Sequence, residues 1–326
     1  MHSWVIEKLG EPKDALRLAE LPEPAVKPGH VKIRVKAAAL NFFDILQCQG
    51  SYQEKYPLPF TPGAEISGEV YEAGEGSRYQ AGQKVMAVPK LPSGGLAEWV
   101  VVPDDLVFPI SDKMTFAAAT SLFTTYHTSY YALHYRANLK PGEVLLVHAG
   151  AGGVGSSAIQ LGCAAGAKVI ATAGGPEKVK ICKELGADVV IDYHSEDFVD
   201  VVKRETDGRG ADVIYDPVGG DVFDRSRKCI AFNGRILVIG FTSGRIADAP
   251  TNHILIKDYS VVGVHYGYFR RLYPEKTEKI QEQLIKLYEE KAIDPLIYKE
   301  FAFTEVPEAL DLLAGRKTWG KVVVKI

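Results

Sequence analysis

A chain of 326 residues with a formal net charge of −3 has no basic surplus of the kind that nucleic-acid-binding proteins use. Hydrophobic residues make up 46% and charged residues 24%, a balance that excludes intrinsic disorder and allows two domains with sizeable cores. No apolar run reaches about 18 residues, and the charged stretch 1–14 does not resemble a secretory signal, so we expect neither a membrane span nor export. Four separated cysteines favour free thiols in a cytoplasmic protein: Cys48, Cys163, Cys182 and Cys229.

The first third of the chain predicts a mainly-β domain. Short runs of β-forming residues stand between Pro- and Gly-rich turn signals, at 31–40, 65–74, 83–89 and 97–103. From Phe116 the residue pattern changes from β-forming runs to a segment that is compatible with a helix. We therefore expect a first domain over residues 1–118.

The middle of the chain alternates apolar runs with segments of helical period. The runs are VLLVHA (144–149), KVIATA (168–173), DVVIDY (188–193), ADVIYDPV (211–218), GRILVIG (234–240) and YSVVGVH (259–265). Near-continuous apolar strands alternating with helices are typical of βαβ units, in which helices cover both faces of a parallel sheet. This predicts an α/β fold with a doubly wound parallel sheet over residues 119–265.

The last part of the chain predicts one more helix and a closing strand. Ile280, Leu284, Leu287 and Tyr288 fall on one helical stripe, and WGKVVVKI at the end is strand-like. We expect residues 266–326 to return to the first domain.

A glycine-rich turn follows the first apolar run of the alternating region. Its residues are Gly150, Gly152, Gly153, Val154 and Gly155, with GxGxxG spacing between a predicted strand and a predicted helix. We expect the first glycine to permit the tight turn, the second to let the backbone approach a diphosphate, and the third to let helix and strand pack closely. The helix N-terminus then offers free N–H groups to the phosphates. The turn predicts a dinucleotide site.

The end of the second strand of this region indicates which dinucleotide binds. An NAD site usually has an acidic residue there for the ribose 2′-hydroxyl, but this strand ends in Ala173 and Gly174. Lys178 lies just beyond and could pair with a 2′-phosphate, although Glu177 beside it could be presented instead. NADP(H) is the favoured cofactor.

Five stretches in chain order carry the motifs of one enzyme family: LNFFDILQCQGSY (40–52), PLPFTPGAEISGEV (57–70), AGAGGVG (149–155), DPVGGDVF (216–223) and GRKTWGKVVV (315–324). They resemble the zinc-independent medium-chain dehydrogenases/reductases, and within them the quinone oxidoreductase, or zeta-crystallin-like, subgroup. The resemblance spans essentially the whole chain. It implies a GroES-like N-terminal domain, a Rossmann domain, NADPH and commonly a homodimer.

No metal site is expected. Where zinc-dependent relatives carry a His in GHE, this chain has Gly63–Ala64–Glu65, and their structural run of four cysteines is missing. The pairs Asp44/Cys48 and His127/His134 could each share a helical face, but we interpret them as structural. Hydride addition to an unactivated ketone leaves an alkoxide that a Lewis acid must stabilise, whereas a quinone or an α,β-unsaturated carbonyl spreads the charge.

The resemblance also implies site residues. Asn41, Asp44 and Tyr52 correspond to side chains beside the nicotinamide, with Tyr52 positioning the acceptor oxygen. Thr128 matches a cofactor-contacting Thr, with Thr124 and Thr125 as rivals. Further cofactor contacts are expected at Tyr193, Phe241, Thr242 and Lys321, while Trp319 departs from the small residue common in the last motif.

The sequence therefore predicts an NADPH-dependent, metal-free reductase of a quinone or α,β-unsaturated carbonyl. One alternative is an enoyl-CoA reductase of the acryloyl-CoA type, with Arg270–Arg271 as candidate partners of the CoA phosphates. Another is a protein that holds NADPH without turnover. The apolar run 259–265 is expected at the sheet edge, where it could pair with a second copy in a homodimer.

Overall fold

The computed structural model describes residues 1–326, and the contacts between α-carbons divide them into two units. Unit 1 comprises residues 1–124 and 295–326, and unit 2 comprises residues 125–294. This division differs from the predicted boundaries, because residues 266–294 group with unit 2. Tyr266 and Gln281 explain why: they hydrogen-bond the two ring nitrogens of buried His127, at 2.6 and 2.7 Å.

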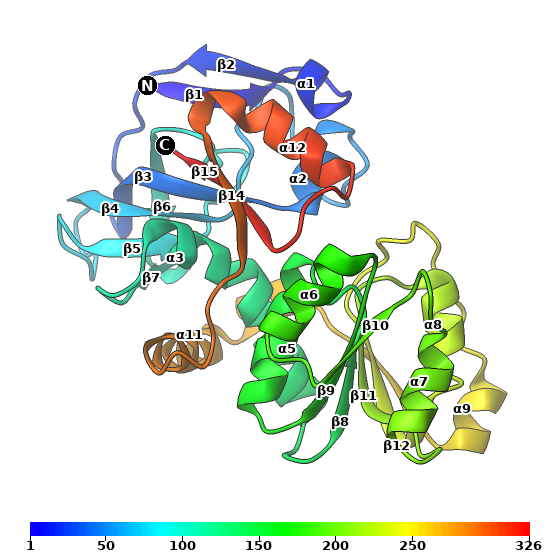
Figure 1. Cartoon of the computed structure of the whole chain (residues 1–326). Coiled ribbons are helices and arrows are strands. Elements are labelled where there is room, and N and C mark those ends of the chain that lie inside the picture. The colour runs from blue at the N-terminus through cyan, green and yellow to red at the C-terminus, as the bar shows by residue number, and fades with distance from the viewer. The chain divides into compact units, whose positions relative to one another are not determined.

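Unit 1 is built on a mainly antiparallel sheet around β3 (His30–Leu40), drawn in blue in Figure 1. The strand order is β14-β15-β3-β4-β5-β7, and β6 also pairs with β3. The partner strands are β4 (Ile66–Ala73), β5 (Lys84–Ala87), β6 (Trp99–Pro103), β7 (Val107–Pro109), β14 (Ile297–Ala302) and β15 (Lys321–Lys325). The last two confirm that the C-terminal segment joins the sheet of the N-terminal domain.

Smaller elements surround this sheet. A hairpin joins β1 (His2–Ile6) to β2 (Leu16–Glu20), and the other elements of unit 1 are α1 (Pro12–Ala15), α2 (Phe42–Cys48), η1 (Asp104–Leu106), α3 (Phe116–Leu122), η4 (Phe303–Glu305) and α12 (Val306–Ala314). The core between them is apolar, with Ile33, Ile66 and Val324 fully buried. Burial of this surface stabilises the unit by the hydrophobic effect.

Unit 2 contains a six-stranded parallel sheet in the order β10-β9-β8-β11-β12-β13. The strands are β8 (Val144–Val147), β9 (Lys168–Ala173), β10 (Val189–Asp192), β11 (Ala211–Asp216), β12 (Ile230–Val238) and β13 (Ser260–Gly263). Numbered within the unit this order is 3-2-1-4-5-6, the order of a Rossmann sheet. The predicted α/β fold, with a doubly wound parallel sheet beside a mainly-β unit, is confirmed.

Helices cover both faces of this sheet. Figure 1 shows α5 (Gly153–Ala164) and α6 (Pro176–Glu184) on one face, with α7 (Phe198–Glu205) and α8 (Gly220–Ser226) on the other. The π-helical turn η2 (Phe123–His127) spans the boundary at residues 124 and 125, and the remaining elements of unit 2 are η3 (Tyr131–Arg136), α4 (Thr128–Tyr130), α9 (Thr251–Lys257), α10 (Tyr266–Leu272) and α11 (Pro274–Glu289). Among all these helices there is no segment both long and apolar enough to cross a membrane.

Candidate functional site

The turn between β8 and α5 is shaped by backbone crowding. Ala149 adopts a left-handed conformation with φ of 51°, and a Cβ added to Gly155 would lie 2.2 Å from the Ala149 carbonyl oxygen. Helix α5 can therefore approach the turn this closely only without a side chain at 155, as predicted. Gly150 differs from the expectation: the left-handed residue is Ala149, and a Cβ at 150 would instead meet Cys182 Sγ at 2.9 Å and Ile159 at 3.0 Å. Its glycine is needed for packing beneath the turn.

The first turn of α5 has the properties of a phosphate site. Gly152 is the N-cap residue and no side chain caps the helix, so the N–H groups of Gly153, Val154 and Gly155 keep their hydrogen-bonding capacity. A Cβ at Gly152 would have a single neighbour within 4 Å, the Ala149 oxygen at 3.3 Å. Uncapped N–H groups at the positive end of a 12-residue helix suit a diphosphate. The residues present fit a dinucleotide.

A buried histidine stabilises the turn between β8 and α5. His148, which precedes Ala149, places its ring nitrogens 3.1 Å from Thr172 Oγ1 and 2.8 Å from Ser226 Oγ. Burial lowers the pKa of His148 to about 4, so the ring is neutral and ties β8 to β9 and α8. The sequence analysis did not single out this residue. The signal was present, since a polar side chain directly before a glycine-rich turn needs buried partners.

The end of β9 brings together several of the predicted cofactor residues. Tyr193 lies over Gly174, where an added Cβ would fall 2.4 Å from the phenol oxygen, and the His194 ring is close by. Lys178 is half-buried in the first turn of α6. The carboxylate of Asp192, at the end of β10, accepts hydrogen bonds from the N–H groups of Gly175 and His194, both at 3.1 Å. Those bonds lower the pKa of Asp192, so the charged carboxylate is held by the backbone N–H groups of the turn.

The other predicted residues of unit 2 lie after β12 and in α4. Phe241 is 48% exposed and borders a hollow of about 70 Å³, and Thr242 bonds the Pro217 carbonyl through its hydroxyl at 3.1 Å. Thr128 begins α4, where its neighbour Ser129 bonds the Val154 carbonyl at 3.2 Å. This bond holds the start of α4 near the first turn of α5.

The backbone groups of the two rival threonines are hydrogen-bonded to other parts of the chain. The Thr125 carbonyl accepts from Ser157 of α5 at 3.1 Å, and the Thr124 N–H donates to Glu65 at 2.6 Å. Both bonds use only the backbone groups of these threonines, so the choice of Thr128 as the cofactor contact stays a prediction.

Unit 1 holds a buried charged cluster at the junction of β3, β4 and β15. The Lys321 ammonium donates to Asn41 Oδ1 at 2.6 Å and to Glu65 Oε2 at 3.0 Å, and Asn41 Nδ2 donates to the same Glu65 oxygen at 3.1 Å. The Lys321 and Glu65 side chains are only 5% and 1% exposed. A buried charge is tolerated when it is paired and hydrogen-bonded. Here each of the three side chains hydrogen-bonds the other two.

Glu65 is the member of this cluster that sequence reasoning missed. It appeared only as part of Gly63–Ala64–Glu65, in the comparison with the zinc-dependent motif. The structure makes it the counter-charge of Lys321 and the acceptor for Asn41 and Thr124. The only sequence signal was a carboxylate directly before the predicted strand, and its burial is visible only in the structure.

Asp44 stands next to the cluster in the first turn of α2. One carboxyl oxygen accepts from the Asn41 N–H at 2.7 Å in a capping box, while the other is buried without a hydrogen-bond partner. Burial raises the pKa of Asp44 to about 7, and the charge of Glu65 adds to the rise against the opposing effects of the Asn41 N–H and of Lys321. Near neutral pH this group can hold or release a proton.

We expect Asp44 to make the folded chain less stable as the pH rises from about 4 to about 7. The carboxyl group of Asp44 loses its proton near pH 3.8 in the unfolded chain and near pH 7 in the folded chain. Its contribution to stability is therefore complete below pH 4, decreases as the pH rises toward 7, and is lost above pH 7. Asp44→Asn keeps the cap but cannot ionise. Between pH 4 and 7.5 the wild type should lose roughly 2–4 kcal/mol of unfolding free energy relative to the variant.

Urea unfolding across this pH range measures the difference, with Asp112→Asn as the control because the Asp112 side chain is 97% exposed. Parallel pH profiles for the wild type and Asp44→Asn would contradict the expectation.

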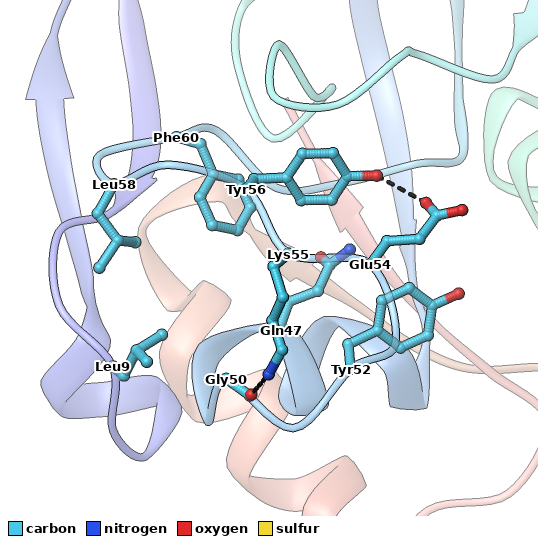
Figure 2. A pocket seen from close by; sticks show the side chains of 9 residues that line it. All are labelled: Leu9, Gln47, Gly50, Tyr52, Glu54, Lys55, Tyr56, Leu58 and Phe60. Atoms are coloured by element: carbon cyan, nitrogen blue, oxygen red, sulfur yellow. Dashed lines mark hydrogen bonds between the residues drawn. The ribbon is translucent and has the colours of Figure 1, made fainter.

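Tyr52 lies on the loop after α2, beside a hollow of about 230 Å³. Its ring packs against Phe43 with centroids 5.7 Å apart, and partial burial, together with the charges of Glu54 and Asp44, raises the pKa of its phenol. Figure 2 shows the ring at one wall of the hollow, with its hydroxyl pointing outward. A phenol with a raised pKa suits hydrogen bonding better than proton donation.

Comparison with known proteins identifies the family. Residues 27–112 match the family model of the alcohol dehydrogenase GroES-like domain, and residues 153–290 match that of the zinc-binding dehydrogenases. A relative from Nematostella vectensis, quinone oxidoreductase-like protein 2 homolog, is 41% identical over 90% of this chain and 81% of its own length.

Two solved structures resemble both units. The quinone oxidoreductase of Pseudomonas syringae pv. tomato is 30% identical with a TM-score of 0.90, over 100% of this chain and 99% of that one. A mycobacterial protein in complex with NADPH is 30% identical with a TM-score of 0.91, over 100% of both chains. The fold and these matches define an oxidoreductase with a GroES-like and a Rossmann unit. The chain belongs to the medium-chain dehydrogenase/reductase family, in its quinone oxidoreductase subgroup.

Proposed function

We propose that this protein is an NADPH-dependent, metal-free reductase that transfers hydride to a quinone or an α,β-unsaturated carbonyl compound. The observation that carries the proposal is the turn at residues 148–155, where crowding around Gly150 and Gly155 holds an uncapped helix N-terminus ready for a diphosphate. A bound dihydronicotinamide supplies the hydride. The overall change takes up one hydride and one proton, so that a quinone becomes a hydroquinone.

The residues at the end of β9 support NADP(H) over NAD(H). Strand β9 ends in Ala173–Gly174–Gly175 without an acidic residue of its own, and the nearby Asp192 carboxylate, at the end of β10, accepts from the Gly175 and His194 N–H groups. Lys178 in the first turn of α6 and the Tyr193 hydroxyl beside Gly174 could donate to a 2′-phosphate. The relative solved with NADPH is consistent with this choice.

Lys178→Ala should weaken NADPH binding about tenfold and leave NADH binding almost unchanged, because one charge-assisted hydrogen bond to a phosphate is lost. Calorimetry with both dinucleotides measures the effect. Lys180→Ala is the matched control, since Lys180 is exposed on the same helix and pairs with Glu184. An equal loss of affinity for NADPH and NADH would contradict a 2′-phosphate contact.

The side chains of unit 1 support the proposal that the hydride acceptor is a conjugated carbonyl compound. No three His, Cys, Asp or Glu side chains are grouped as a metal site, and position 64 is an alanine where zinc-dependent relatives place a histidine. Tyr52 would donate a hydrogen bond to the acceptor oxygen as a neutral phenol, and water would supply the proton. Asn41, fixed by Lys321 and Glu65, positions this region without ionising.

An acceptor panel tests the proposal. NADPH oxidation would be followed with 1,4-benzoquinone, 9,10-phenanthrenequinone, an alkenal and acryloyl-CoA, with NADH in parallel and a metal assay on the same protein. We expect turnover with the quinones or the alkenal and no stoichiometric zinc. Turnover of acryloyl-CoA alone would favour the enoyl-CoA reductase. Tight NADPH binding without oxidation would favour a non-catalytic protein, and stoichiometric zinc would refute the mechanism.

We also propose a cytoplasmic homodimer that continues the sheet of unit 2 through residues 259–265. Strand β13 is the last strand of the sheet, and Leu255 and Ile256 on the adjacent α9 are 81% and 77% exposed. Such an edge invites pairing with a second copy. Free cysteines support a reducing compartment. Sedimentation showing a monomer at micromolar concentration would reject the dimer.

A further inference from the structure

The hollow beside Tyr52 has one polar group that nothing in the chain satisfies. Gln47 of α2 lines it and is only 4% exposed, yet its carboxamide oxygen has no hydrogen-bond partner. Leaving a buried acceptor unpaired costs about 1–3 kcal/mol. In Figure 2 the Gln47 side chain lies amid the labelled residues of the hollow. An unpaired amide in such a place indicates a ligand that completes its hydrogen bonding.

The charged neighbours of Gln47 already have partners. The Glu54 carboxylate accepts from the Tyr56 hydroxyl at 2.7 Å, and the Lys55 ammonium donates to the Gly50 carbonyl. The remaining walls are largely apolar or aromatic: Leu9, Leu58, Phe60 and the rings of Tyr52 and Tyr56. The hollow therefore combines aromatic walls with a single amide, which suits a flat and mostly apolar ligand.

Size and chemistry narrow the ligand further. An engineered apolar cavity of about 150 Å³ binds benzene, so a hollow of about 230 Å³ accommodates one or two fused rings. The unpaired oxygen requires a donor. A hydroxyl group both donates and accepts, so it matches the carboxamide whichever way the amide is turned about its last bond. A phenol satisfies this requirement, whereas a ring whose oxygens only accept cannot pair with the carboxamide oxygen.

We infer that this hollow is a binding site for hydroxylated aromatic rings, with the ring between Tyr52, Tyr56 and Phe60 and the hydroxyl donating to Gln47. One consequence rests on the proposed function: the hydroquinone formed from a quinone is such a ring, so the site would retain the product. The binding itself requires neither dinucleotide nor turnover.

Calorimetry on the full chain without dinucleotide tests the site, with 2-naphthol as the probe and 2-methoxynaphthalene as the matched ligand that cannot donate. We expect 2-naphthol to bind, and Gln47→Leu to weaken it about tenfold, as for one lost hydrogen bond. The methoxy compound should bind the wild type no better than 2-naphthol binds the variant. Gln49→Leu is the control, because Gln49 is exposed on the same helix end and bonds only Glu11.

Two further measurements keep the result decisive. Gln47→Leu removes an unsatisfied buried amide, so its melting temperature should not fall below that of the wild type. Leu9→Trp, at an exposed position on the rim, should fill the hollow and abolish binding of both compounds. Undetectable 2-naphthol binding, or equal binding by the wild type and Gln47→Leu, would overturn the inference. A chain that binds 2-naphthol but reduces no acceptor would refute only the proposed function.

Discussion

Gly155→Ala should abolish dinucleotide binding and destabilise unit 2. The new Cβ would lie 2.2 Å from the Ala149 oxygen and 2.9 Å from Gly150 Cα, distances that no rotamer change can relieve because both neighbours are backbone. Helix α5 must move away from the turn, so the N–H groups that would hold the diphosphate lose their alignment. We expect the unfolding free energy to fall by roughly 3 kcal/mol, and the affinity for NADPH to fall more than a hundredfold.

Gly152→Ala separates the two effects. Its Cβ would meet one atom within 4 Å, at 3.3 Å, so the fold should tolerate the change. The methyl group would nevertheless obstruct the backbone approach to the diphosphate that we propose for this turn. This variant should melt near the wild-type temperature and still bind NADPH poorly. Gly267→Ala is the control, because its Cβ would meet nothing closer than 3.9 Å. Normal NADPH affinity in Gly155→Ala would show that the turn does not hold the dinucleotide.

The sheet of unit 2 could be predicted because each of its strands has a recognisable pattern of apolar residues. A parallel strand covered on both faces is apolar at nearly every position, and all six predicted runs are strands in the structure. The prediction was wrong at one junction: in the segment of helical period expected between the runs 211–218 and 234–240, helix α8 ends at Ser226, and β12 begins at Ile230 rather than Gly234. Ile230 pairs with Ala211 ahead of a bulge, a tertiary contact that no local pattern announces.

The charged cluster of unit 1 could not be predicted in the same way. Lys321 and Asn41 are 280 residues apart and meet because β15 runs antiparallel to β3, with Val322 opposite Leu40. Sheet register decides this meeting, and register depends on which strands pair. The sequence indicated Asn41 and Lys321 only through a family motif, and it left their shared partner Glu65 unnoticed. Gln47 was hidden for a similar reason, since its burial follows from the loop that folds over α2.

Breaking the Lys321–Glu65 pair from one side should cost far more than removing both charges. Lys321→Met leaves the Glu65 carboxylate without its cation at 1% side-chain exposure, and Glu65→Gln leaves the Lys321 ammonium without its anion at 5% exposure. Each single variant should lose about 3–5 kcal/mol of unfolding free energy, since an uncompensated buried charge remains. Urea unfolding at pH 7.5 measures these losses.

In the double variant Lys321→Met/Glu65→Gln neither charge of the pair remains, and the new amide can still serve its neighbours. Its oxygen can accept from the Thr124 N–H, which now bonds Glu65 at 2.6 Å, and its nitrogen can donate to Asn41 if that carboxamide turns over. The double variant should therefore be more stable than either single variant, with a coupling free energy of about 3 kcal/mol. Lys36 and Glu69, which form a partly exposed pair 3.8 Å apart, provide the control cycle, where the coupling should stay below about 1 kcal/mol. Additive losses at Lys321 and Glu65 would mean that the two charges are solvated independently, and the buried cluster would then not be what holds Asn41 in place.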